Sequence, residues 1–191
     1  MSAPPAPGGS PLRFARAEDC VDALIARVGR RITLALPLGL GKAAALANAL
    51  YARAKADTGI ELVICTALTL EAPRPRAGLE QRFLGPIAER LFRDCPVLDY
   101  ATDQRLGRLP GNVRVVEFYF RPGANLGVPA AQQAYASLNY THAAREMLAR
   151  GVNVVAQMVS APREVAGAPH LSLACNPDVT LDLLDAARDV R

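Results

Sequence analysis

The turn Pro37–Lys42 (PLGLGK) is the first segment whose residues could bind a ligand. It follows an apolar, strand-like run and precedes an alanine-rich segment, and the backbone N–H groups at such a turn favour an anion. Gly39 and Gly41 satisfy the loose dinucleotide-binding pattern GxGxx(G/A). A phosphate-binding P-loop would instead require glycine in place of Leu36 and serine or threonine in place of Ala43. The segment is therefore either a ligand-binding turn or a tight turn whose glycines only permit the backbone path.

The dinucleotide pattern also needs an acidic residue at the end of the second strand, where it would bind the ribose. Glu61 begins that strand, and Glu71 lies beyond it in the proline-rich loop EAPRPRAG. An NAD(P)-dependent oxidoreductase is therefore the least favoured interpretation.

The segment Ser137–His142 (SLNYTH) brings Asn139, Tyr140 and His142 together between two helical pieces. Such a group could hold a polar ligand or donate a proton. In the simpler interpretation, which the spacing alone favours, Asn139 or Thr141 caps the following helix while Tyr140 packs.

The remaining reactive side chains indicate neither a metal site nor a catalytic group. Four cysteines lie far apart without a CxxC pair, and only two histidines occur, so zinc-ligand spacing is absent. Cys65 and Cys175 lie in apolar runs and are expected to be buried free thiols, which indicates a reducing, cytoplasmic compartment. His170 is expected to be structural, and Asp182 and Asp185 to be solvated.

These residues need a fold to position them, and helical and strand-like patterns alternate along the chain. Helices are expected over 17–28, 43–57, 79–93 and 130–150, the last broken near Asn139, and from Thr180, capped by Asp178 or by Thr180 itself. Strands are expected over 31–36, 61–67, 113–120 and 152–160, with 170–175 as an antiparallel partner. Strands separated by helices predict an α/β fold with a mostly parallel sheet and helices on both faces.

The helix expected over 79–93 has an apolar face. Leu79, Phe83, Ile87 and Leu91 follow one another at four-residue spacing. We expect this face to be buried.

The composition suits one soluble globular domain, with 51% hydrophobic and 21% charged residues among 191. No apolar run of about 18 residues occurs, and residues 1–14 lack the apolar core of a signal peptide. We expect a flexible leader over 1–14 and no membrane contact. Apart from Lys42 and Lys55, the basic residues are arginines interleaved with acids, so the net charge of +4 does not indicate a nucleic-acid partner.

Several long segments, in the same order, resemble the amino-terminal half of the acetyl-CoA hydrolase/transferase family. They are 35–57 (ALPLGLGKAAALANALYARAKAD), 62–92 (beginning LVICTALTLEAPRPRAG), 107–160 (including GNVRVVEFYFRPGANLGVP and YASLNYTHAARE) and 171–188 (LSLACNPDVTLDLLDAAR). The resemblance covers about residues 17 to 190. It implies a Rossmann-like CoA-transferase arrangement over 15–191, in agreement with the alternating pattern.

The resemblance also implies an activity. Members of this family pass CoA from an acyl-CoA to a carboxylate or to water, through an acyl anhydride and a glutamyl-CoA thioester. CoA thioester is thus a substrate, and no tightly bound cofactor is expected. The family's glutamate nucleophile belongs to a second, carboxy-terminal half, so we expect it outside these residues. Glu71, Glu117 and Glu164 lie in none of the family's recognised motifs and are not assigned that role.

What the resemblance implies for the site is a cleft between the two halves. Gly39 and Gly41, together with Asn139, Tyr140 and His142, are the residues expected to line it. The expected partners are a carboxy-terminal half or a second copy of the chain. A non-catalytic module that binds CoA or a nucleotide remains the alternative.

Overall fold

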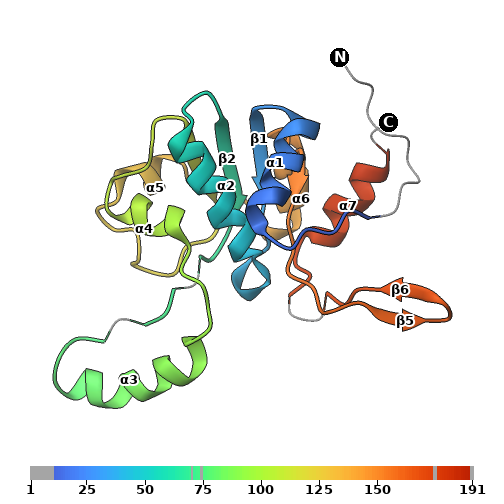
Figure 1. Ribbon diagram of the computed structural model, residues 1–191. Coiled ribbons are helices and arrows are strands. Elements are labelled where there is room, and N and C mark those ends of the chain that lie inside the picture. The colour runs from blue at the N-terminus through green and yellow to red at the C-terminus, as the bar shows by residue number, and fades with distance from the viewer. Residues whose placement is uncertain (1–10, 70, 74, 174–175, 190–191) are drawn as a thin grey trace.

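The computed structural model describes residues 11–69, 71–73, 75–173 and 176–189, and a four-stranded parallel sheet lies at its centre (Figure 1). The strands are β1 (Arg31–Ala35), β2 (Glu61–Thr66), β3 (Val113–Glu117) and β4 (Val154–Val155). Their order is β3-β2-β1-β4, and every neighbouring pair is parallel. The predicted α/β fold with a mostly parallel sheet is confirmed at this level.

Helices cover both faces of the sheet, as predicted. Because side chains alternate along a strand, Leu34 and Ala35 of β1 point to opposite faces. Leu34 packs in a core with Val21 of α1 (Ala17–Val28) and Leu50 of α2 (Ala44–Ala56). Ala35 packs in a second core with Met147 of α6 (Ala143–Ala149) and Leu183 of α7 (Thr180–Asp189). Two covered faces explain why the strands have no alternating pattern.

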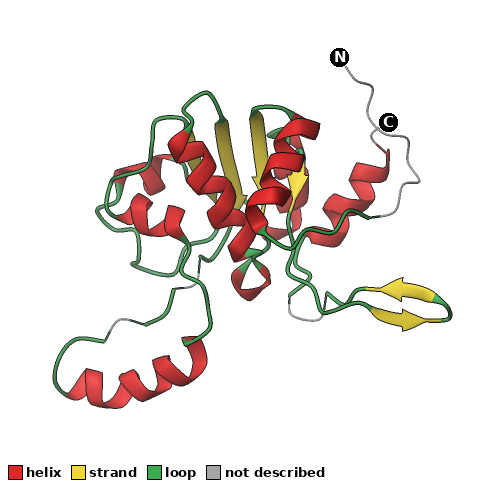
Figure 2. Ribbon diagram, in the orientation of Figure 1, coloured by secondary structure: helices red, strands yellow, loops and turns green. Residues whose placement is uncertain are grey.

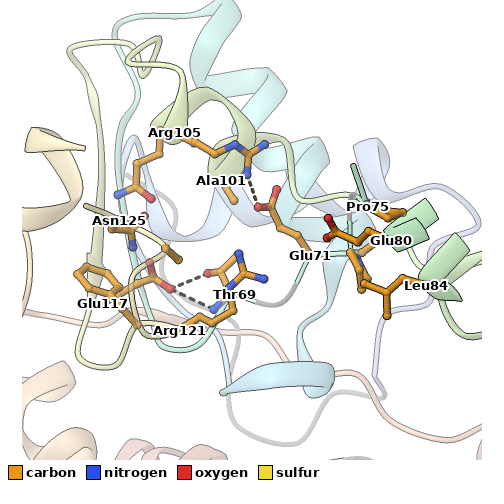
Figure 3. Close-up of a pocket in the computed structure, with 15 residues that line it drawn as sticks. Thr69, Glu71, Pro75, Glu80, Leu84, Ala101, Arg105, Glu117, Arg121 and Asn125 are labelled. Atoms are coloured by element: carbon orange, nitrogen blue, oxygen red, sulfur yellow. Dashed lines mark hydrogen bonds and ion pairs between the residues drawn. The ribbon is translucent and has the colours of Figure 1, made fainter. Parts of the chain in front are cut away.

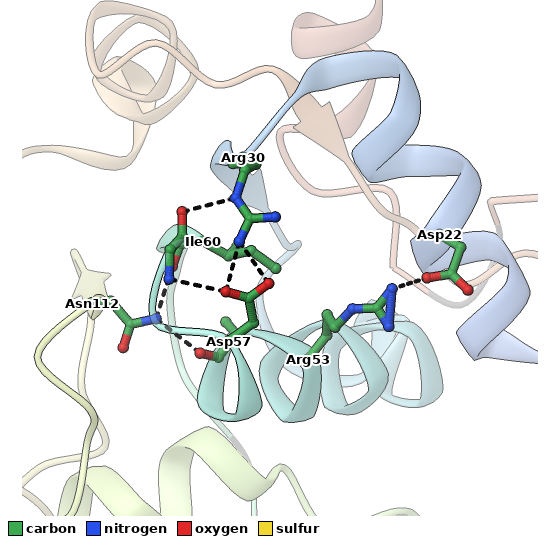
Figure 4. A network of polar contacts seen from close by, with 8 residues as sticks. Asp22, Arg30, Arg53, Asp57, Ile60 and Asn112 are labelled. Carbon is green, nitrogen blue, oxygen red and sulfur yellow. Dashed lines mark hydrogen bonds and ion pairs between the residues drawn. The ribbon is translucent and has the colours of Figure 1, made fainter.

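The turns at the amino ends of the strands are joined by a polar network (Figure 4). The Arg30 guanidinium donates to both carboxylate oxygens of Asp57 at 2.6 Å and to the Gly59 carbonyl at 3.2 Å. Asn112 donates to the Ile60 carbonyl at 2.7 Å. This network holds β1, β2 and β3 in register from the end opposite to the one at which ligands of parallel sheets bind.

The helix α3 (Leu79–Phe92) begins where predicted, but its apolar face is not buried. Leu79, Phe83, Ile87 and Leu91 are 79%, 69%, 43% and 66% exposed. Figure 1 shows α3 apart from the helices that cover the sheet. The prediction was wrong because the spacing of apolar residues shows that they share a face, but not that another part of the chain covers it.

The second half of the chain contains several shorter elements (Figure 2). The helical stretch expected over 130–150 consists of α5 (Pro129–Gln133), the 3₁₀ turn η2 (Tyr140–His142) and α6, which confirms a break near Asn139. The short helix α4 (Asp99–Arg105) was not predicted.

The strand expected over 152–160 is reduced to Val154–Val155, and no strand occurs over the described residues 171–173 of its expected partner, although the Ser160 N–H donates to the Ser172 carbonyl at 3.0 Å. Instead, β5 (Arg163–Val165) and β6 (Ala168–His170) form an antiparallel hairpin. The two residues between them, Ala166 and Gly167, have φ values of 51° and 77°. Positive φ at both positions is the geometry of a two-residue hairpin turn. Cys175 lies outside the described residues.

Among the described residues, no helix combines the length and the apolar character needed to cross a membrane.

Candidate functional site

The carboxyl ends of β1, β2 and β3 lead into loops that carry polar side chains. In open parallel sheets, ligands bind at this edge because the loops leave a crevice there. Two cavities are found nearby, of about 460 Å³ and 480 Å³.

The predicted glycine turn is the 3₁₀ turn η1 (Gly39–Gly41), at the end of β1. Gly39 has a φ of 63° and lines the 480 Å³ cavity, which is mostly apolar and also contacts Cys20 and Cys95. Gly41 is buried, and a Cβ atom there would lie 2.6 Å from the Asn176 carbonyl oxygen. Close packing against Asn176 therefore explains Gly41.

Lys42 closes this turn instead of extending toward a ligand phosphate. Its side chain is 5% exposed, and its Nζ donates to the carbonyls of Pro37 at 2.6 Å and Ala67 at 2.7 Å. Burial lowers the pKa of Lys42 to about 8, although Glu117 and Asp178 raise it. The lysine thus joins the loops after β1 and β2.

The second predicted segment lies beside the glycine turn. Asn139 accepts hydrogen bonds from the N–H and the hydroxyl of Thr141, both at 3.2 Å, so it caps η2 as one interpretation held. Asp178 accepts a hydrogen bond from the Tyr140 hydroxyl and another, at 2.6 Å, from the Leu38 N–H. The His142 side chain is exposed.

The structure therefore brings the two predicted segments together, and Asp178 is the residue that joins them. Of the five predicted cleft residues, Gly39 alone lines either of the two large cavities. The other four are Gly41, Asn139, Tyr140 and His142, and their place in a cleft stays a prediction.

The 460 Å³ cavity is polar, and the sequence analysis did not find it (Figure 3). It lies among the loop after β2, the helix α4 and the end of β3. Its volume falls in the range of small-molecule sites. The side chains that bring hydrogen-bonding groups to it include Thr69, Glu71, Gln104, Arg105, Glu117 and Arg121.

Glu117 is the most deeply buried acid in this cavity. It ends β3 and is 4% exposed. Its Oε1 accepts hydrogen bonds from the Thr69 hydroxyl at 2.6 Å and from the Thr69 N–H at 3.2 Å. Burial raises the pKa of Glu117, while Thr69 and the Lys42 ammonium act in the opposite direction. Its Oε2 has no hydrogen-bond partner among the described residues.

Two neighbouring residues of α4 also bring groups without partners to the cavity. Gln104 is 5% exposed, and its side-chain amide makes no hydrogen bond with the described residues. Arg105 pairs with Glu71 through Nη1, whereas its buried Nη2 has no hydrogen-bond partner in the described part of the chain. Buried polar groups are rarely left without partners, so these groups indicate a place for a ligand.

One sequence signal could have pointed to this cavity. Glu117 is an acid inside the apolar run VRVVEFYF, and a charged residue in a strand covered on both faces needs a partner. No sequence signal of this kind pointed to Gln104 and Arg105, because α4, the helix that carries them, has only seven residues. The expected absence of a metal site stays untested, although no group of three metal-ligating side chains occurs among the described residues.

Comparisons with protein-family models, with curated proteins and with solved structures found no match for this chain. The site's own geometry and the resemblance of its segments are therefore the basis for a function.

Proposed function

We propose that this chain is the amino-terminal half of an acyl-CoA transferase or acyl-CoA hydrolase. The enzyme would move CoA between an acyl-CoA and a carboxylate, or to water, through a glutamyl-CoA thioester. The observation that carries this proposal is the resemblance of several long segments, in order, over about residues 17 to 190. The four-stranded parallel sheet supports it, because the family's halves are α/β units of this kind.

The polar cavity is the best place in this chain for the acid substrate. It lies at the carboxyl edge of the sheet, where parallel α/β folds bind ligands. Arg105 and Arg121 line it, and guanidinium groups bind carboxylates through paired hydrogen bonds. The predicted cleft, which would contain Gly39, Gly41, Asn139, Tyr140 and His142, would then face the second half and the CoA.

The glutamate that forms the thioester is proposed to lie outside this chain. A nucleophilic carboxyl group must be held in a dry, oriented pocket. Glu117 is disfavoured, because it lies in none of the family's recognised motifs and because the Thr69 hydroxyl and N–H hold its Oε1. Glu164 is exposed on the β5–β6 hairpin, away from the cavity. Glu71 is paired with Arg105.

The free cysteines Cys20, Cys65 and Cys95 fit a reducing compartment, and we place the protein in the cytoplasm.

A trapping experiment tests this proposal. The purified chain is mixed with the carboxy-terminal half of a family member, acetyl-CoA and a carboxylate acceptor, and borohydride then reduces any glutamyl thioester to the alcohol. Turnover should require both halves, and mass spectrometry should find the reduced glutamate on the added half.

Two results would contradict the proposal. A reduced glutamate on this chain, which the variant Glu117→Gln would abolish, would place the nucleophile in this half. Binding of CoA without turnover in the mixture would support the non-catalytic module instead.

A further inference from the structure

The polar cavity contains groups of both hydrogen-bonding kinds that have no partner among the described residues. The donors are the side-chain NH₂ of Gln104 and the partly exposed guanidinium of Arg105, whose enclosed Nη2 has no hydrogen-bond partner. The unpartnered acceptors are the Oε2 of Glu117 and the Oε1 of Gln104. Glu117 and Gln104 are both more than nine-tenths buried, so bulk water is a poor substitute for a fixed partner.

These groups limit the chemistry of a ligand. A plain carboxylate only accepts hydrogen bonds, so it would leave Glu117 Oε2 and Gln104 Oε1 without donors. A plain amine only donates, so it would leave Arg105 and the Gln104 NH₂ without acceptors. A ligand that carries both an anionic and a cationic group can satisfy all four.

The charged side chains of the cavity also favour a ligand that carries both an anionic and a cationic group. Glu117 is a buried acid at the end of β3, and Arg105 brings a guanidinium that pairs with Glu71 through Nη1. In the view of Figure 3, Arg105 lies at the top of the cavity, Arg121 at the bottom and Glu117 between them. A guanidinium, together with a carboxyl group that ionises beside a cation, complements a zwitterion.

We propose that this cavity binds a small amino acid. Its carboxylate accepts from Arg105 and from the Gln104 NH₂, and its ammonium donates to Glu117 and to the Gln104 carbonyl oxygen. The role of this amino acid as the carboxylate that accepts CoA rests on the proposed function, whereas its binding to this chain does not.

Binding also has a consequence for protons. A cation beside Glu117 favours the ionised carboxyl group, which burial in the empty cavity disfavours. Near the pKa of Glu117, the ligand should therefore displace a proton from it. A structural glutamate that does not contact the ligand would release none.

Isothermal titration calorimetry of the full chain, without CoA, tests the proposal. The probe is β-alanine, and propionate and n-propylamine are matched controls that lack one of its two charges. We expect β-alanine to bind at least about tenfold more tightly than either control. We expect Glu117→Gln to weaken β-alanine binding about tenfold, and the exposed Glu164→Gln to leave it unchanged.

Titrations in two buffers of different ionisation enthalpy give a second readout. Proton release on β-alanine binding should occur in the unmodified chain and be lost in Glu117→Gln. If circular dichroism shows that Glu117→Gln is unfolded, the unmodified chain still tests the proposal. Its affinities for the three ligands and its proton release on β-alanine binding are then the measurements that count. Equal affinity for propionate, tighter binding of 3-hydroxypropionate, or no proton release at any pH across the titration range of carboxyl groups would overturn the proposal. Because no CoA is present, failure of this binding experiment is distinguishable from failure of the transfer experiment.

Discussion

At the scale of single residues, the burial of Lys42 has a measurable effect on stability. Burial lowers its pKa to about 8 from an ordinary value of 10.5, and the nearby Glu117 and Asp178 only partly oppose this. Between these two pH values, the unfolded chain binds more protons than the native chain. The free energy of unfolding should therefore rise with pH in this window and stay level below it.

The variant Lys42→Met measures this contribution. From pH 7 to about 9.5, the unmodified chain should gain about 2 kcal/mol of unfolding free energy relative to the variant. Urea denaturation at several pH values gives the free energy of unfolding of the unmodified chain and of the variant. Lys55→Met is the matched control, because the Lys55 side chain is 52% exposed, and its difference from the unmodified chain should change little with pH. A constant difference for Lys42→Met would show that this ammonium is not desolvated.

At the scale of elements, Asp178 joins the glycine turn after β1 to the turn η2. It accepts from the Leu38 N–H and from the Tyr140 hydroxyl. The pKa of Tyr140 is raised to about 12, first by burial and then by the hydrogen bond and charge of Asp178. This contact positions the predicted cleft segment 139–142.

A double-mutant cycle of Tyr140→Phe with Asp178→Asn tests this link. We expect a coupling free energy of about 1 kcal/mol in urea denaturation, because the hydrogen bond is charge-assisted but partly exposed. Asparagine also tolerates the φ of 47° at this position, so the backbone should not be strained. Tyr119 is 48% exposed against 49% for Tyr140, and the same cycle with Tyr119→Phe should show no coupling. Equal coupling in both cycles would mean that the contact is not specific.

The elements also show how far the sequence predicts this fold and this site. The helix at Ala17–Val28 and the buried strands were predictable, because their patterns are set by neighbours on both faces of the sheet. The cavity was not, because Thr69, Gln104 and Glu117 meet only once the order of the strands and the place of α4 are known. The hairpin was missed because its two-residue turn lacks the usual glycine or asparagine at the first position, which is Ala166.

At the scale of the whole molecule, α3 presents an apolar stripe, the side chains Leu79, Phe83, Ile87 and Leu91, to solvent. Large exposed apolar patches are uncommon in monomeric soluble proteins and mark a place where another surface packs. If the chain is one half of a two-part fold, this stripe should associate with a second copy when the carboxy-terminal half is missing. The stripe contributes little to the stability of the chain itself, because none of the described residues of α3 is buried.

The double variant Phe83→Ser/Leu91→Ser separates association from stability. By light scattering at two well-separated concentrations, the mass of the unmodified chain should rise with concentration and that of the variant should not. The free energy of unfolding should change by less than about 0.5 kcal/mol, since both side chains are exposed. Leu50→Ala is the opposite control. Because Leu50 is fully buried, this substitution should lower the free energy of unfolding by about 3 kcal/mol. Addition of a carboxy-terminal half of the family should suppress self-association of the unmodified chain. A monomer at both concentrations, indifferent to the added half, would mean that α3 needs no partner and that the chain works alone.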